Sequence, residues 1–348
     1  MLPSTTTLTA KQQDRLDRMC PAGHNAAIGT VVRGVQTDIA DLLGSAYGPG
    51  LTLYVDGKYG SDDVTVAAPN RYPASAVNHG TTWATAFKTI QAALTVARGA
   101  GTGSNPALDS NYDQDHHVTV VVAPGNYAEN LIMVGAGIRL VGIGVPGTDR
   151  GVSVTPPDMS GSYPGSMIVQ GSGLEIGNIL LVNNFAYPTM WFDKMHSSWV
   201  HDVVFYGDGD ATKAFTTNGM KNSILEHCRI SEFSAAGIEV NYDASSPDYL
   251  IGSQIRHNRI GQGSGTGILV DVNLVAYDSS IYDNTVIGAL TLGIDNNATG
   301  PIAIHDNFAC IVDNTAPIES ASTIGGMHRN AVVYNANGTR TFPFPANA

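Results

Sequence analysis

A six-residue pattern repeats seven times in the second half of the chain, and it constrains the fold more than any other feature. In each copy the first and sixth residues are apolar, whereas the residues between them are mostly polar. The first residues lie 24, 25, 30, 26, 23 and 23 positions apart, and a period of about 20 to 50 residues predicts a solenoid. Helical periodicity is absent, so we expect short strands that meet at a bend once per coil. The copies begin at Ile176, Val200, Leu225, Ile255, Ile281, Ile304 and Met327.

Stacking of these coils in register places equivalent residues in columns. Parallel strands about 4.8 Å apart would put the first residues in one inward column and the sixth residues in another. A second short strand, beginning at Gly237, Gly267 and Gly293, recurs in step with the repeat at spacings of 30 and 26. We therefore predict an all-β fold, a parallel β-helix held together by burial of two apolar columns. The sixth-residue column consists of Leu181, Phe205, Ile230, Ile260, Val286, Ala309 and Val332.

The fourth residue of the repeat is asparagine in four successive copies. We interpret these residues as a structural ladder at a tight bend, because asparagine tolerates the left-handed backbone conformation. Its side-chain amide donates on one side and accepts on the other, so each ladder residue is expected to bond to both neighbouring coils. The ladder consists of Asn258, Asn284, Asn307 and Asn330.

The chain is expected to divide into four segments. Residues 1–50 have apolar positions at helical spacing and are predicted to form a helical arm for docking or oligomerisation, packed either on the solenoid or on a neighbouring subunit. Residues 51–115, with a strand and a helix that begins after Thr82, suit an end cap over the first coil. Residues 116–340 are predicted to form the β-helix, and residues 341–348 a C-terminal tail.

Two stretches near the start of the solenoid carry a family resemblance. Residues 82–93, which begin Thr-Trp-Ala-Thr-Ala-Phe, and residues 120–129, Val-Val-Val-Ala-Pro-Gly-Asn-Tyr-Ala-Glu, resemble the right-handed parallel β-helix of the pectin-lyase-like superfamily. The segment Tyr54-Val55-Asp56-Gly57 is similar to the opening region of bacteriophage virion and tailspike-type proteins with this fold. The resemblance covers roughly residues 51–335. It implies the fold but no single activity, since enzymes and structural proteins share this scaffold.

The acidic composition argues against several classes of partner. The net charge is −12 without a basic cluster, whereas binding to nucleic acid requires clustered lysine and arginine. The same charge disfavours anionic membranes, and it disfavours an acidic polysaccharide unless local basic patches exist. No window approaches about 18 apolar residues, so no membrane span is expected. The first residues lack the features of a signal peptide, so we expect synthesis in the host cytoplasm.

Three carboxylates on comparable strands are the candidates for catalysis: Asp193, Glu239 and Asp295. Glu239 and Asp295 each follow the glycine of the second strand by two residues, two coils apart, which corresponds to about 9.6 Å along the axis. That separation is near the upper limit for an inverting glycosidase. The alternative is that all three are solvated carboxylates of an acidic protein. The Gln-Asp-x-Leu and Asp-Phe-x-Phe-Gly segments of pectin methylesterases, the esterases that share this scaffold, are absent from the chain.

Two further groups of side chains suggest ligands. His227 and His257 occupy the third position of adjacent repeats, with aspartates before and after them, which suits either a zinc ion or a polar column that needs no metal. We expect no metal and no cofactor. The aromatic residues Trp191, Trp199 and Tyr206 are candidates for carbohydrate binding, although core packing or a subunit interface explains the same residues.

These observations favour a bacteriophage virion protein without enzymatic activity, which decorates or cements the capsid or forms a head or tail appendage. The resemblance implies a homo-oligomer, a trimer, in contact with major capsid or tail proteins. The alternative is a tailspike-type depolymerase that binds and cleaves host surface polysaccharide in a groove lined by Asp193, Glu239 and Trp191.

Overall fold

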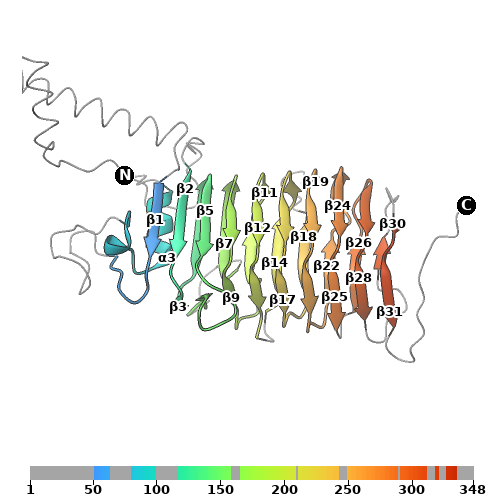
Figure 1. The fold of residues 1–348 in the computed structure, drawn as a ribbon. Helices are drawn as coiled ribbons and strands as arrows, with labels where there is room; N and C mark the ends of the chain where they lie inside the picture. Colours follow the sequence, from blue (N-terminus) through green and yellow to red (C-terminus); the bar gives the residue numbers. More distant parts are fainter. Residues whose placement is uncertain are drawn as a thin grey trace, which may run out of the picture.

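Three parallel sheets run side by side along the molecule and form a parallel β-helix (Figure 1). The computed structural model describes residues 51–62, 80–98, 117–157, 165–208, 211–242, 249–288, 291–311, 318–320 and 327–334. The predicted arm at 1–50 and the predicted tail at 341–348 lie outside these residues. Within them, no helix is long and apolar enough to cross a membrane.

The ten-stranded sheet contains the first strand of each hexad. Its order is β1 (Leu51–Val55), β2 (Val118–Val122), β5 (Ile138–Gly142), β8 (Glu175–Gly177), β12 (Trp199–His201), β16 (Ile224–Glu226), β20 (Gln254–Arg256), β24 (Ser279–Tyr282), β27 (Ile302–His305) and β30 (Met327–His328).

The nine-stranded sheet contains the second strand of each hexad. Its order is β3 (Gly125–Tyr127), β6 (Val152–Val154), β9 (Leu180–Val182), β13 (Val204–Tyr206), β17 (Arg229–Ser231), β21 (Arg259–Gly261), β25 (Thr285–Gly288), β28 (Phe308–Ile311) and β31 (Ala331–Tyr334). The strand β6 has only three residues, of which Val152 and Val154 are buried.

The twelve-stranded sheet closes the coil and divides at β7 into two ladders. One ladder runs β7 (Met167–Ser172), β10 (Met190–Phe192), β14 (Lys213–Asn218), β18 (Ala236–Asn241), β22 (Thr266–Val270), β26 (Leu292–Asn296) and β29 (Ile318–Ser320). The other runs from β7 through β11 (Met195–His196), β15 (Met220–Lys221), β19 (Tyr249–Ile251) and β23 (Val275–Tyr277), and β4 (Leu131–Ala136) also pairs with β7.

The predicted register of the repeat is confirmed by the strand pairing. Val200 pairs with both Ile176 and Leu225, and this column continues to Met327. The sixth residues pair in the same way from Leu181 to Val332. Both columns point inward and are buried wherever their side chains are described, so each buried valine, leucine, isoleucine or phenylalanine in them contributes about 1.5 to 3 kcal/mol of hydrophobic stabilisation.

The bend inside each hexad differs in one respect from the prediction. The left-handed residue is the third of the hexad and not the asparagine, with φ of 54° at His227, 55° at His257 and 53° at Asp283. The asparagine that follows is buried and faces the stack. Asn284 Nδ2 donates to the carbonyl oxygen of Ile255 in the preceding coil at 2.9 Å and to Asn307 Oδ1 in the next coil at 3.0 Å. The structure thus places the four asparagines in one hydrogen-bonded ladder.

A second ladder, made of serines, lies at the bend that precedes the hexad. The backbone N–H of Ser198 donates to Ser223 Oγ at 3.1 Å, that of Ser223 to Ser253 Oγ at 3.2 Å, and that of Ser253 to Ser279 Oγ at 3.1 Å. This ladder was not predicted, although its serines precede the first hexad residue by two positions in four successive coils.

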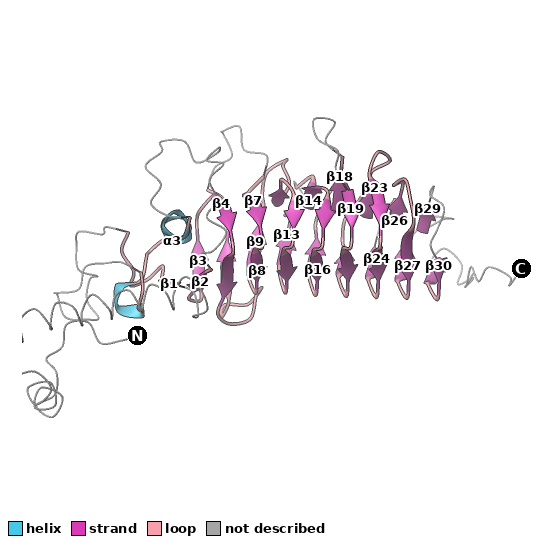
Figure 2. Ribbon diagram, turned by 90° about the horizontal axis from the view of Figure 1, so that it is seen from above, coloured by secondary structure: helices cyan, strands magenta, loops and turns pink. Residues whose placement is uncertain are grey.

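The only α-helix of the described residues is α3 (Ile90–Ala97), which packs against β1, β2 and β4 at the N-terminal end of the stack (Figure 2). The prediction of a helix directly after Thr82 was wrong. A 3-10 turn, η1 (Trp83–Thr85), is followed by an extended segment in which Phe87 pairs with Val55, and Thr89 then caps α3. The apolar spacing of residues 83–97 suited a helix, but bridge formation with β1 prevailed over it.

Candidate functional site

The outer face of the twelve-stranded sheet carries the predicted catalytic residues. Strand pairing places Trp191, Thr216 and Glu239 in one column, and Leu269 and Asp295 continue it. Glu239 and Asp295 therefore lie two strands apart with Leu269 between them. Asp193 follows β10 and lies outside this column, where its Oδ1 accepts a long hydrogen bond of 3.5 Å from Asn218 Nδ2.

Intramolecular partners already occupy the carboxylate of Glu239. Its Oε2 accepts from Lys213 Nζ at 2.5 Å and from Thr216 Oγ1 at 2.7 Å, and the residue is only 8% exposed. A buried carboxylate whose hydrogen bonds are already made within the protein stabilises the sheet and is not free to bind a sugar.

The second carboxylate of the column has a different environment. Burial raises the pKa of Asp295, and a hydrogen bond of 2.8 Å from Asn297 Nδ2 lowers it by less, so the pKa lies above its ordinary value. A raised pKa suits a general acid, but an inverting glycosidase also requires a free base across the sugar. Glu239 is bound to Lys213, and Leu269 lies between the two carboxyls. The column therefore does not provide a general acid and a free general base on opposite sides of a sugar.

The three aromatic residues predicted to bind carbohydrate are not brought together. Trp191 lies on the twelve-stranded sheet, Trp199 on the ten-stranded sheet and Tyr206 on the nine-stranded sheet. Trp199 stacks on His201 with the ring centroids 3.9 Å apart, and its indole N–H donates to Glu226 Oε1 at 2.9 Å. Neighbours along the chain turn onto different faces of each coil, so these three residues do not line one common surface.

The two histidines at the hexad bend do lie side by side. The rings of His227 and His257 stack with centroids 5.1 Å apart and an angle of 10° between their planes. Each faces a carboxylate at a longer distance, Glu226 at 3.8 Å and Asp283 at 3.9 Å. In the part of the chain that the structure describes, no group of three or more histidine, cysteine, aspartate or glutamate side chains is placed to hold a metal ion.

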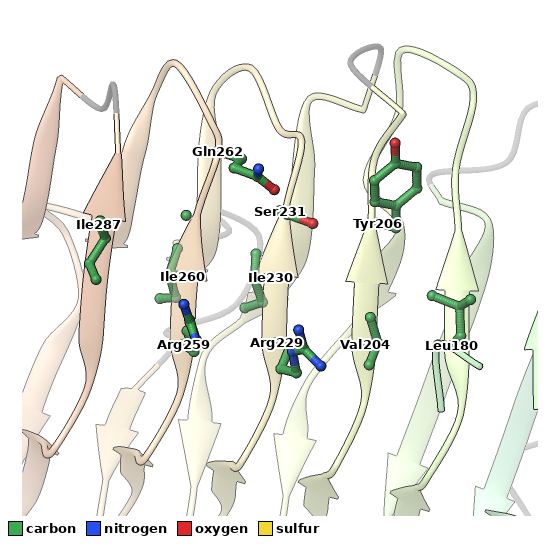
Figure 3. A pocket seen from close by; sticks show the side chains of 12 residues that line it. Leu180, Val204, Tyr206, Arg229, Ile230, Ser231, Arg259, Ile260, Gln262 and Ile287 are labelled. Carbon is green, nitrogen blue, oxygen red and sulfur yellow. The ribbon is translucent and has the colours of Figure 1, made fainter. Parts of the chain in front are cut away.

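A groove of about 470 Å³ lies on the nine-stranded sheet, away from the predicted catalytic column (Figure 3). It extends over β9, β13, β17, β21 and β25, which corresponds to about 19 Å along the axis for four strand spacings. We call it the nine-strand groove. Its lining consists of Gly147, Leu180, Val204, Tyr206, Arg229, Ile230, Ser231, Arg259, Ile260, Gly261, Gln262 and Ile287.

Side chains of different chemistry occupy two rows of the nine-strand groove. One row runs Leu180, Val204, Arg229 and Arg259, and strand pairing places the two arginines directly opposite each other. Figure 3 shows them at the same level on adjacent strands. A parallel row begins with Tyr206 and Ser231, which are also paired. The groove therefore presents an apolar floor, an exposed phenol and several hydrogen-bond donors.

None of the sequence predictions pointed to the nine-strand groove, although the repeat contains the information that places its arginines. Arg229 and Arg259 are the fifth residues of adjacent hexads, so the repeat alone places them on adjacent strands. The fifth position varies between leucine, valine, arginine, threonine, phenylalanine and alanine, and it therefore shows no pattern along the chain. Of the predicted ligand-binding residues, only Tyr206 lines the nine-strand groove.

No family model matches the sequence, and no curated protein matches it. Among solved structures, the chain is similar to YbhC of Escherichia coli, at 13% identity over 76% of this chain and 88% of that chain, with a TM-score of 0.42. A pectin methylesterase in complex with a hexasaccharide matches at 13% identity over 75% and 82% of the two chains, with a TM-score of 0.37. DFA-IIIase from Arthrobacter chlorophenolicus A6 without its lid matches at 13% over 71% and 84%, with a TM-score of 0.39. These likenesses concern the fold alone, and the strand pairing itself shows a parallel β-helix.

Proposed function

We propose that this protein binds a polysaccharide along the nine-strand groove and does not cleave it. The observation that carries the proposal is the groove itself, which is elongated along the stack and combines an apolar floor with the phenol of Tyr206. Sugar rings present apolar faces to aromatic side chains and hydroxyl groups to hydrogen-bonding ones. Ser231, paired with Tyr206, and Gln262, which follows β21, supply hydrogen-bonding groups along the groove.

The absence of cleavage in the proposal rests on the state of the carboxylates. Glu239 is bound to Lys213 and Thr216, and Asp295 lies two strands away beyond Leu269. Among the described residues that line the nine-strand groove there is no aspartate or glutamate, so these residues offer no general acid or base of that kind.

We further propose that the bound polysaccharide belongs to a host cell surface and that the protein acts on a bacteriophage virion as a trimer. The support for this setting is the resemblance of the segments at 54–57 and 82–93 to the opening regions of phage β-helix proteins. Docking to capsid or tail proteins through residues 1–50 is part of the same proposal.

Binding and cleavage are tested together on one panel of fluorescently labelled bacterial surface polysaccharides. The purified full chain is expected to bind at least one of them and to release no reducing ends, and circular dichroism is used to establish that it is folded. Tyr206→Ala is expected to weaken binding roughly two- to tenfold, in line with the loss of one aromatic contact. The matched control is Tyr249→Ala, because Tyr249 is as exposed as Tyr206 (40% against 38%) but lies on another sheet.

The two claims, binding in the groove and the absence of cleavage, are contradicted by different results. Sustained release of reducing ends would show that the protein is an enzyme and would direct attention to Glu239 and Asp295. Folded protein that binds no member of the panel, or equal losses in the two tyrosine variants, would remove the nine-strand groove as the binding site.

A further inference from the structure

We infer that the nine-strand groove selects sugars that carry an oxyanion, a carboxylate, sulfate or phosphate group, through Arg229 and Arg259. The inference rests on the proposed function and adds the chemical class of the ligand. Nothing in the acidic composition of the chain points toward such a ligand, because a net charge of −12 repels polyanions in general.

The pair places two positive charges on directly paired residues of adjacent strands. Their α-carbons are separated by one strand spacing, about 4.8 Å, and like charges that face each other across a strand pair are destabilising. Both side chains are exposed and line the groove. A sheet that keeps such a pair gains stability when an anion binds between the two guanidinium groups.

Other arginines on the coils are neutralised by carboxylates of the chain itself. Arg139 is bound to Glu175 at 2.6 Å, Arg256 to Glu226 at 2.6 Å and Arg329 to Asp306 at 2.7 Å. Among the described residues no carboxylate is paired with Arg229 or Arg259, although the chain has 30 acidic residues. The donors of these two side chains are thus left for a ligand.

The guanidinium group matches oxyanions in particular. Its planar fork donates two parallel hydrogen bonds to a carboxylate, sulfate or phosphate, and such charge-assisted bonds are about twice as strong as neutral ones. On one side the row continues with the apolar Val204 and Leu180, and on the other with Thr285. The positive stretch therefore covers two strands only, which suits isolated charges on a sugar chain and not the continuous phosphates of a nucleic acid.

The test compares three forms of one polymer: dextran, carboxymethyl-dextran and dextran sulfate. The full chain is expected to bind the two charged forms about tenfold or more tightly than dextran, since a hydrogen bond to a charged group is worth about that factor. The double variant Arg229→Gln/Arg259→Gln is expected to bind all three forms equally. The matched control is Lys88→Gln/Lys221→Gln, which removes the same charge at exposed positions outside the groove.

The outcomes separate this inference from the proposed function. If the wild type binds dextran and its charged forms equally, the inference is wrong while polysaccharide binding stands. If the arginine and lysine variants lose affinity for the charged polymers equally, the binding is general electrostatic attraction and not recognition by the two arginines. If a single-stranded oligonucleotide competes as well as dextran sulfate, the ligand class is wrong. Binding of none of the three polymers would overturn the inference and count against the proposed function as well.

Discussion

The backbone N–H of Asn258 and its side-chain Nδ2 both donate to Oδ1 of Asn284 in the next coil, each at 3.0 Å. One amide oxygen thus satisfies two donors of the preceding coil. Both asparagines are 1% exposed, so water cannot take the place of either partner.

We predict that replacement of this acceptor lowers the stability of the fold. Asn284→Ala leaves the buried N–H of Asn258 without an acceptor, and we expect the free energy of unfolding to fall by about 1 to 3 kcal/mol. Asn273→Ala is the control, because Asn273 is exposed on a turn. Urea denaturation of the two variants measures the difference, and equal midpoints would show that the ladder contributes nothing.

The ion pair of Glu226 predicts a dependence of stability on pH. Burial alone would raise the pKa of Glu226, but the hydrogen bond and positive charge of Arg256 outweigh it and hold the pKa below the ordinary value of 4.5. The stabilisation is therefore complete above about pH 4.5 and is lost as the pH falls through the lower folded pKa.

Urea midpoints of the wild type and Glu226→Gln check this. They are expected to differ clearly near pH 7 and to converge once the pH has fallen below the lowered folded pKa of Glu226. In the control Glu232→Gln, which removes a carboxylate of the neighbouring bend, the midpoint is expected to stay close to that of the wild type. A gap between wild type and Glu226→Gln that does not change with pH would contradict the assigned ion pair.

Because Glu239 is paired with Lys213, its replacement distinguishes a structural role of this carboxylate from a catalytic one. Glu239→Gln weakens the two hydrogen bonds to its carboxylate, and we expect a loss of roughly 1 to 3 kcal/mol in stability without a change in polysaccharide affinity. The double variant Glu239→Gln/Lys213→Met is expected to be more stable than the sum of the single effects. If polysaccharide affinity falls and stability is unchanged, Glu239 belongs to a ligand site.

The thiol of Cys228 is expected to be inert in the folded protein. It takes the place of asparagine in the ladder, and burial raises its pKa to about 12, so almost no thiolate forms at neutral pH. Iodoacetamide labelling followed by peptide mass spectrometry is expected to modify Cys228 only after unfolding. Cys310, which is partly exposed, serves as the internal comparison. Rapid labelling of Cys228 in folded protein would contradict its position.

The repeat predicted the coils because an inward-facing position must stay apolar, since a polar residue there would destabilise the core. Ile255 and Ile260 are apolar for that reason, and their register follows. Outward positions such as those of Arg229 and Arg259 obey no such constraint, so the nine-strand groove emerged only from the structure. Trp191 and Trp199 are only eight residues apart in sequence but lie on different sheets of the coil, so their closeness in sequence did not indicate a shared surface.

The backbone donors of both ladders point in one direction along the chain. The backbone N–H of Ser223 donates to Ser253, and that of Asn258 donates to Asn284, so each of these N–H groups finds its acceptor in the coil that follows. The ribosome delivers coils in that same order. The newest coil on a growing chain therefore always has its bend donors bound to water, and its successor closes them. Removal of coils from the C-terminal end would leave such a backbone N–H open at each bend, whereas removal from the N-terminal end would open side-chain donors, such as Asn284 Nδ2, that bond to a carbonyl of the preceding coil.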